Sequence, residues 1–117
     1  MKGKLGDKQR LQHILDAIFE IEQYTADVEI EVFLENSMMR FAAIKQIEII
    51  GEAANHLSES TKNKFQGIIW RQIIGMRNIL IHEYFGIDSQ LIWQIIVIDI
   101  PQLKTAIQSV MASGNIG

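Results

Sequence analysis

The chain has 117 residues and 48% of them are hydrophobic, which suits one domain with a single core and argues against disorder. It contains no cysteine, which excludes a disulfide framework and a thiolate metal site and fits a reducing cytoplasm. Its net charge of −3 argues against broad, nonspecific nucleic-acid binding but leaves room for a local basic site.

Hydrophobic spacing predicts a first helix that starts near Asp7. Its apolar stripe comprises Leu11, Ile14, Ile18, Ile21 and Thr25. Ser37 is expected to cap a second helix. The stripe of that helix comprises Phe41, Ile44, Ile47, Gly51, Ala54 and Leu57. The small residues Gly51 and Ala54 would allow a neighbouring helix to approach closely.

Ser58 and Ser60 are candidate caps for a short third segment, which Gly67 should end. The fourth helix holds "GMRNILIHEYFG" and should stop near Gly86, which suits a left-handed C-terminal position. Asp88 can cap the fifth helix. Its predicted inward residues are Leu91, Ile95, Ile98 and Val110. Pro101 should kink this helix or leave one carbonyl without its partner.

These elements predict an all-α, up-and-down bundle of about five helices. The whole chain, 1–117, reads as one domain, with residues 1–6 and 112–117 frayed. The fifth helix is apolar on more than one side, because Ile92, Trp93, Ile96 and Val97 join its inward stripe. A small bundle has one core to offer such a helix, so a second buried face, most simply a homodimer interface, is expected.

Neither a signal peptide nor a membrane span is expected. The first ten residues lack an apolar segment, and the longest uncharged apolar run near the C-terminus, residues 89–98, is too short to cross a bilayer. A cytoplasmic protein without membrane contact follows as the expectation.

Charge is unevenly distributed along the chain. Residues 16–35 hold seven acids and no base, whereas residues 60–84 hold four bases against one acid. Such runs often mark no more than two solvated helix faces. The alternative is that the basic half meets a polyanion, with Arg71, Lys62 and Lys64 as candidate contacts to RNA phosphates.

The fourth helix carries an unusual polar set, Arg77, Asn78, His82 and Tyr84. Arginine holds two phosphate oxygens, and histidine exchanges a proton near neutral pH. Asn78 could fix the imidazole tautomer. Metal-free RNA cleavage needs a base for the 2′-hydroxyl, a cation and a positioned phosphate, and DNA lacks that hydroxyl. No residues with metal-ligand spacing are present, so neither a metal nor a cofactor is expected.

A structural role is the alternative for each of these residues, because an arginine five positions before a histidine also arises by chance. His13 and His56 read as surface residues. Trp70 and Trp93 read as core or interface anchors. Glu52 is either a buried carboxylate with a basic partner or a solvated one.

The string "WRQIIGMRNILIHEYFGID" resembles the HepT-like branch of the HEPN superfamily. The signature of that branch is Arg, four residues, His, one residue, Tyr, which falls on Arg77, His82 and Tyr84. "RLQHILDAIFEIEQYT", "IEIIGEAANHLSE" and "LIWQIIVIDIPQLKTAI" resemble its first, second and last helices, so nearly the whole chain is covered. One departure is Ile69, where many relatives have a proline before the Trp.

The resemblance implies a homodimer with the Arg and His of both protomers in one cleft. It implies the toxin of a type VII-like HEPN/MNT toxin–antitoxin pair, a metal-independent ribonuclease acting on RNA such as tRNA or mRNA. Arg77 and His82 would be catalytic and Asn78 supporting. A cognate MntA-type nucleotidyltransferase would silence the toxin by AMPylation of Tyr84. The alternative is a non-catalytic helical dimer that binds a nucleotidyltransferase or a nucleotide.

Overall fold

The computed structural model describes the backbone of residues 2–65, 67–82 and 88–114, and the side chains of 6–65, 67–76 and 88–114. All regular elements in these ranges are helical, as the sequence predicted. They are α1 (Lys2–Thr25), α2 (Ile30–Glu35), α3 (Ser37–Asn55), α4 (Glu59–Lys62), α5 (Trp70–His82), α6 (Ser89–Gln94), the π-helical turn η2 (Ile95–Asp99) and α7 (Ile100–Ala112).

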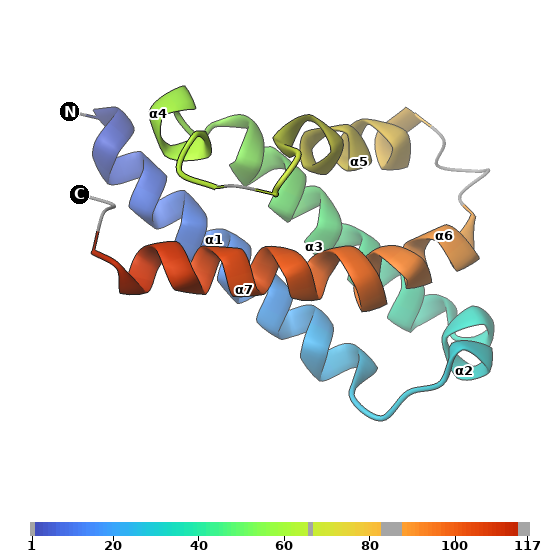
Figure 1. The fold of residues 1–117 in the computed structure, drawn as a ribbon. Coiled ribbons are helices and arrows are strands. Elements are labelled where there is room, and N and C mark those ends of the chain that lie inside the picture. The colour runs from blue at the N-terminus through green and yellow to red at the C-terminus, as the bar shows by residue number, and fades with distance from the viewer. Residues whose placement is uncertain (1, 66, 83–87, 115–117) are drawn as a thin grey trace.

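The long helices run in alternating directions, and α3 is the central one (Figure 1). It packs against α1 along one side and against α5 along another. The C-terminal helix crosses in front and packs on α1 through α7, while α2 closes the far end against α3 and α6. The start of α1, the short α4 and the end of α7 lie at the same end of the bundle (Figure 1).

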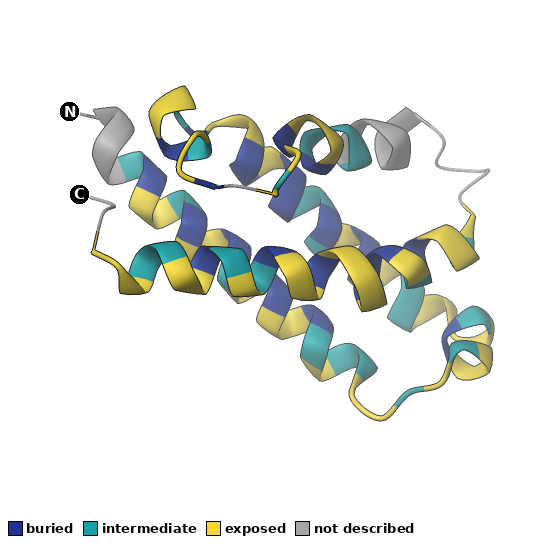
Figure 2. Cartoon of the chain, viewed as in Figure 1, coloured by how far each residue is buried: buried dark blue, intermediate teal, exposed yellow. Residues whose placement is uncertain are grey.

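The core consists mainly of isoleucine on the inner faces of these helices (Figure 2). The predicted stripe of α1 is confirmed from Leu11 to Ile21, since Leu11, Ile14, Ile18 and Ile21 are buried, whereas Thr25 at its end is only partly buried. The stripe of the second helix is confirmed except at its start, because Phe41 is 49% exposed. Phe41 lies in the second turn of α3, before the first buried side chains of that helix, Ala43 and Ile44.

The structure places the starts of two helices at other residues than the sequence predicted. Asp7 does not begin α1, which starts at Lys2; instead its side chain is 3% exposed inside the bundle. Asn36, not Ser37, caps α3, and its side chain accepts a hydrogen bond from the Met39 amide at 2.9 Å. The predicted caps Ser58 and Asp88 are confirmed, because each side chain accepts a bond from a backbone amide of its helix.

The helix α2 was not predicted. Its six residues lie inside the acidic segment, and its N-cap residue, Glu29, makes no side-chain capping bond. A single buried side chain, Phe33, holds it to the bundle, with the ring of Trp93 at 5.1 Å. Leu34 packs partly buried against the core, and the Arg40 guanidinium of α3 donates a hydrogen bond to the Leu34 carbonyl. A six-residue helix held by such tertiary contacts leaves little trace in local sequence.

The C-terminal helix is continuous from Ser89 to Ala112 and contains the π turn just before Pro101. Proline cannot donate a backbone hydrogen bond and crowds the carbonyl four residues earlier, and here the Ile100 amide bonds the Ile95 carbonyl five residues back. The sequence predicted a kink or an unpaired carbonyl at Pro101, and the structure shows a π turn there within a continuous helix.

The inward face of this helix differs from the prediction. Leu91 is 39% and Ile98 is 53% exposed, so only Ile95 is fully buried among the predicted inward residues, with Val110 partly so. The side chains that face inward are Ile92, Ile95, Ile96, Ile100, Leu103 and Ile107. Most of these residues still follow steps of three and four, so the prediction chose the wrong starting residue. Leu91 precedes the π turn and is exposed, whereas its neighbour Ile92 is buried.

By length and composition alone, the helix Ser89–Ala112 could also cross a membrane. It is longer than the uncharged run on which the contrary expectation was based. Its buried isoleucines pack in the bundle core, and the core helices of soluble proteins share this length and composition.

Candidate functional site

The predicted catalytic residues lie on α5. The backbone places Arg77, Asn78 and His82 in the last two turns of that helix, as the sequence predicted. Tyr84 lies outside the described residues. Arg71 is exposed in the first turn of α5, Lys62 ends α4, and Lys64 is exposed in the segment between the two helices.

The helical register separates these positions into two sides of α5. Position 77 lies about 20° around the axis from Trp70, seven residues earlier, and Trp70 is only 8% exposed. Positions 78 and 82 each lie about 20° from Arg71, which is exposed. Position 77 is therefore aligned along the helix axis with the buried Trp70. Positions 78 and 82 are aligned with Arg71, and this side of α5, which is exposed at Arg71, is here called the open side.

Gly75 lies between Arg71 and position 78 on the open side. A Cβ atom built on Gly75 would meet no atom of the described residues within 4 Å. A side chain is therefore not excluded there by the fold of the single chain. Because glycine has no side chain, a bound molecule could approach the backbone of α5 at Gly75, midway between Arg71 and the motif.

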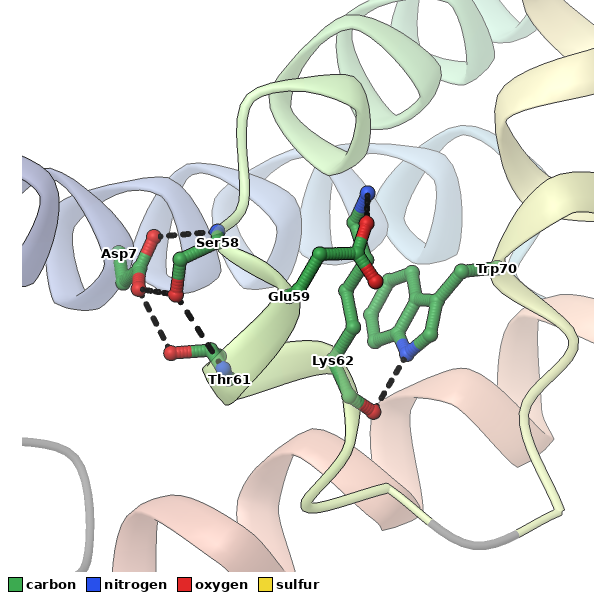
Figure 3. A network of polar contacts seen from close by, with 6 residues as sticks. All are labelled: Asp7, Ser58, Glu59, Thr61, Lys62 and Trp70. Carbon is green, nitrogen blue, oxygen red and sulfur yellow. Dashed lines mark hydrogen bonds and ion pairs between the residues drawn. The ribbon is translucent and has the colours of Figure 1, made fainter.

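The N-terminus of α5 is anchored to α4 through Trp70. Its indole Nε1 donates a hydrogen bond to the Lys62 carbonyl at 3.2 Å (Figure 3). The ring of Phe65 meets the indole edge-on at a centroid distance of 5.1 Å, a favourable aromatic geometry. Trp70 is thus a core anchor, as predicted, and it fixes the position of Lys62 relative to Arg71.

A pocket of about 450 Å³ lies between α4 and α5. It is lined by Glu59, Lys62, Asn63, Phe65, Ile68, Trp70, Arg71 and Ile74. Two of the three predicted phosphate contacts, Lys62 and Arg71, are therefore brought to one concave surface. Lys64 does not line this pocket.

The ammonium group of Lys62 is held close to the pocket. Its side chain is 14% exposed, and Nζ lies 3.7 Å from Oε1 of Glu59, whose own side chain is 84% exposed (Figure 3). The separation exceeds a hydrogen bond, and a pair with such an exposed partner contributes little stability. An anion could therefore replace Glu59 beside Lys62 at small cost.

The helix α4 is held in place by Asp7 of α1. The carboxylate of Asp7 accepts hydrogen bonds from the Ser58 amide at 3.0 Å, from the Ser58 hydroxyl and from the Thr61 hydroxyl at 2.6 Å (Figure 3). Burial raises the pKa of this carboxyl, but the bonds from Ser58 and Thr61 and the nearby charge of Arg10 outweigh burial and lower it. No local sequence signal links Asp7 to residues more than fifty positions away.

The remaining histidines lie away from α5. His13 and His56 are exposed, as predicted. His56 is nevertheless not isolated, since its Nε2 lies 3.0 Å from Oε1 of Glu52. Glu52 is itself exposed, so the prediction of a buried carboxylate is wrong and that of a solvated one holds, with a histidine beside it. No cluster of three potential metal ligands occurs among the residues whose side chains are described.

The all-helical fold and the motif-bearing helix define a helical domain of the HEPN class. The chain belongs to the HepT-like family, which is described as "Ribonuclease HepT-like" and matches residues 14–110. This confirms the family predicted from the string around Arg77 and His82. RNase activity is the property that the family and the names of its members support.

Several curated proteins are similar over most of the chain. "Putative RNase MJ1380" of Methanocaldococcus jannaschii is 39% identical over 92% of this chain and 99% of its own length. "Probable ribonuclease HepT" of Thermococcus cleftensis is 40% identical over 86% of this chain and 92% of its own. A larger protein of M. jannaschii, "Gamma-glutamylcyclotransferase and putative RNase MJ0434", is 42% identical, and this chain spans 46% of it. No solved structure gives a significant match.

Proposed function

We propose that this protein is the toxin of a HEPN/MNT toxin–antitoxin pair and cuts RNA without a metal ion, using Arg77 and His82. The observation that carries the proposal is the placement of Arg77, Asn78 and His82 on one helix, α5, of a chain in the HepT-like ribonuclease family. The cytoplasm, where RNA and a cognate antitoxin would meet it, is the proposed location.

The proposed reaction is a transesterification within the RNA. The imidazole of His82 removes the proton of a 2′-hydroxyl, and the 2′-oxygen attacks the neighbouring phosphorus. The bond to the 5′-oxygen of the next nucleotide breaks, that oxygen takes up a proton from water, and a 2′,3′-cyclic phosphate remains. Arg77 stabilises the charge that develops on the phosphoryl oxygens, and Asn78 holds the imidazole in one tautomer.

The register of α5 supports a site completed by two protomers. Positions 77 and 82 are about 140° apart around the helix axis, so a single α5 directs the two side chains only partly toward one another. A two-fold axis beside α5 would bring Arg77 and His82 of both chains into one cleft. Exposed Leu91, Val97 and Ile98 on the C-terminal helix supply apolar surface for such a homodimer.

The proposed antitoxin is an MntA-type nucleotidyltransferase that transfers AMP from ATP to the hydroxyl of Tyr84, with release of pyrophosphate. The added phosphate would compete with RNA phosphate for Arg77, and the adenosine would fill the groove. Both effects block the substrate without unfolding the toxin.

The second candidate function is a non-catalytic helical dimer that binds a nucleotidyltransferase or a nucleotide. The pocket between α4 and α5 favours it in one respect, because an open basic pocket can bind a nucleotide without any cleavage. The motif on α5 favours the ribonuclease, since a scaffold has no evident need for an arginine, an asparagine and a histidine there.

Cleavage of a defined RNA separates the two functions. The parent should cut a labelled single-stranded RNA in EDTA and leave 2′,3′-cyclic phosphate ends, and a single 2′-deoxy nucleotide at the cut should block it. Arg77→Ala and His82→Ala should each lower the rate by at least about 100-fold with unchanged circular dichroism. His13→Ala is the matched histidine control. Loss of activity in EDTA with recovery on adding a divalent ion would refute the metal-free mechanism.

A further inference from the structure

We propose that the pocket between α4 and α5 binds one nucleotide of the RNA at a distance from the bond that is cut. The proposal rests on the proposed ribonuclease function. It adds a second RNA-binding site, which positions the strand relative to the bond that is cut. The phosphate of this nucleotide lies between Lys62 and Arg71, and its base enters the apolar part of the pocket.

The pocket has the composition that a nucleotide requires. One side is apolar, formed by Ile68, Ile74 and the aromatic pair Phe65 and Trp70. The other side carries Lys62 and Arg71, which together outnumber the single acid, Glu59. A volume of about 450 Å³ falls in the usual range for small-molecule sites. An apolar wall beside two cations matches a base attached to a phosphate.

The two cations are held in different ways that suit one phosphate. Lys62 is restrained, because its side chain is mostly covered and its carbonyl is bonded by Trp70. Arg71 is exposed one residue after Trp70, so it can close over the phosphate from the rim with its planar fork. Displacing the exposed Glu59 carboxylate from Lys62 costs little, as the 3.7 Å separation indicates.

The register of α5 connects this pocket to the motif. Arg71, Gly75, position 78 and position 82 follow one another at intervals of four, three and four residues, which places them on one side of the helix. Gly75 leaves that side open halfway along. An RNA strand lying on this side would pass from the pocket to position 82 close to the backbone at Gly75, which has no side chain.

The open side of α5 from Arg71 to His82, here called the track, limits how many nucleotides can lie between the pocket and the cut. Arg71 and His82 are eleven residues apart, about 16 Å along the axis at 1.5 Å per residue. Stacked nucleotides advance about 3.4 Å each, so the track holds at most about five of them. RNA shorter than this on one side of the cut should reach His82 but not the pocket.

The experiment measures binding in a protein that cannot cut. His82→Ala with Trp93→Phe leaves Trp70 as the one tryptophan, because the chain has two. Phenylalanine keeps a ring against Phe33, which Trp93 contacts. The probes are a single-stranded 2′-O-methyl RNA octamer and the dinucleotide of the same sequence, followed by Trp70 fluorescence and by anisotropy of a labelled octamer at several salt concentrations.

The octamer should change the Trp70 fluorescence and the dinucleotide should not. Arg71→Gln and Lys62→Gln should each weaken octamer binding several-fold and lower the slope of log Kd against log salt by about 0.7, the value for one phosphate of a single strand. Lys45→Gln, which removes an exposed charge on α3, should change neither. Lys62→Arg should restore most of the binding.

Three results would overturn the pocket: no octamer binding, binding that leaves Trp70 unchanged, or equal effects of Arg71→Gln and Lys45→Gln. Arg71 is exposed, so its variant tests the pocket even if Lys62→Gln disturbs α4. Failure of the ribonuclease function is seen separately, as absence of cleavage by the parent protein. A Trp70 response that depends on Arg71 would support the pocket even in that case.

Discussion

The carboxylate of Asp7 on α1 accepts a hydrogen bond of 2.6 Å from the hydroxyl of Thr61 on α4, across 54 positions of the chain. The same carboxylate also receives the Ser58 amide and hydroxyl at the start of α4. A four-residue helix has almost no stability of its own. Asp7 therefore fixes α4 in position, and with it Lys62 at the edge of the pocket.

Replacing Asp7 by asparagine should destabilise the protein. The uncharged amide cannot satisfy three donors as the carboxylate does, and each poorly satisfied buried group costs about 1–3 kcal/mol. We expect a loss of that size in the free energy of unfolding, measured with urea at pH 7. Asp16→Asn is the matched control, because Asp16 is exposed on the same helix and should change stability by less than about 0.5 kcal/mol.

The effect of Asp7 should depend on pH in one direction. Its pKa in the folded protein lies below its ordinary value of 3.8, so the carboxylate stabilises the folded state fully above that value. This stabilisation is lost as the pH falls through the folded pKa. The difference in unfolding free energy between parent and Asp7→Asn should be constant from pH 7 to about pH 5 and shrink below pH 3.8. A difference that grows on acidification would contradict this assignment.

The cap of α3 is testable by two neighbouring substitutions. Asn36→Ala removes the side chain that accepts the Met39 amide and should cost about 1 kcal/mol. Ser37→Ala removes an exposed side chain inside the first turn and should be close to neutral. Thermal unfolding of both variants decides between the two residues, and a larger loss for Ser37→Ala would mean that the helix begins one residue later.

Disrupting the proposed dimer should remove activity without removing the motif. Ile98 is 53% exposed on the C-terminal helix, and Ile98→Glu would place a charge in an apolar contact between protomers. We expect a monomer in sedimentation velocity, native circular dichroism and at least a tenfold loss of RNA cleavage. Met38→Glu is the control, since Met38 is exposed on α3. A monomeric Ile98→Glu protein with full activity would disprove the shared cleft.

Tyr84→Phe tests whether the tyrosine is regulatory. The variant should keep RNA cleavage and toxicity but escape neutralisation by the transferase activity of the partner, because phenylalanine has no hydroxyl to accept AMP. Intact mass after co-expression should show AMP-sized additions on the parent and none on the variant. Persistent additions would place the modification elsewhere, and an inactive variant would assign Tyr84 to catalysis or positioning.

The sequence predicted those parts of the fold that repeat regularly. The stripe from Leu11 to Ile21 is buried because its spacing matches one face of a straight helix. Ser58 and Asp88 were found because capping acts between residues two or three positions apart. The family was predicted for a similar reason, since Arg77, Asn78, His82 and Tyr84 form one compact string.

What the sequence did not predict about the pocket and the segments around it depends on contacts between distant parts of the chain. Asp7 looked like a helix start because its true partners, Ser58 and Thr61, are far along the chain. The pocket combines Lys62 with Arg71 only because Trp70 joins α4 to α5. The sequence placed Lys62, Lys64 and Arg71 in one basic segment, and only the fold separates Lys64 from the other two.

The π turn at Ile95–Asp99 also bears on how the length of this chain can vary. A π turn holds one residue more than the α-helical turn it replaces. It therefore accommodates a single-residue insertion between α6 and α7. Deleting the exposed Val97 should let the turn revert to α-helix while Ile92 and Ile107, on either side, keep their places in the core. A deletion of one residue inside α3, which is α-helical throughout, would instead rotate the rest of that helix by about 100° relative to the part before the deletion.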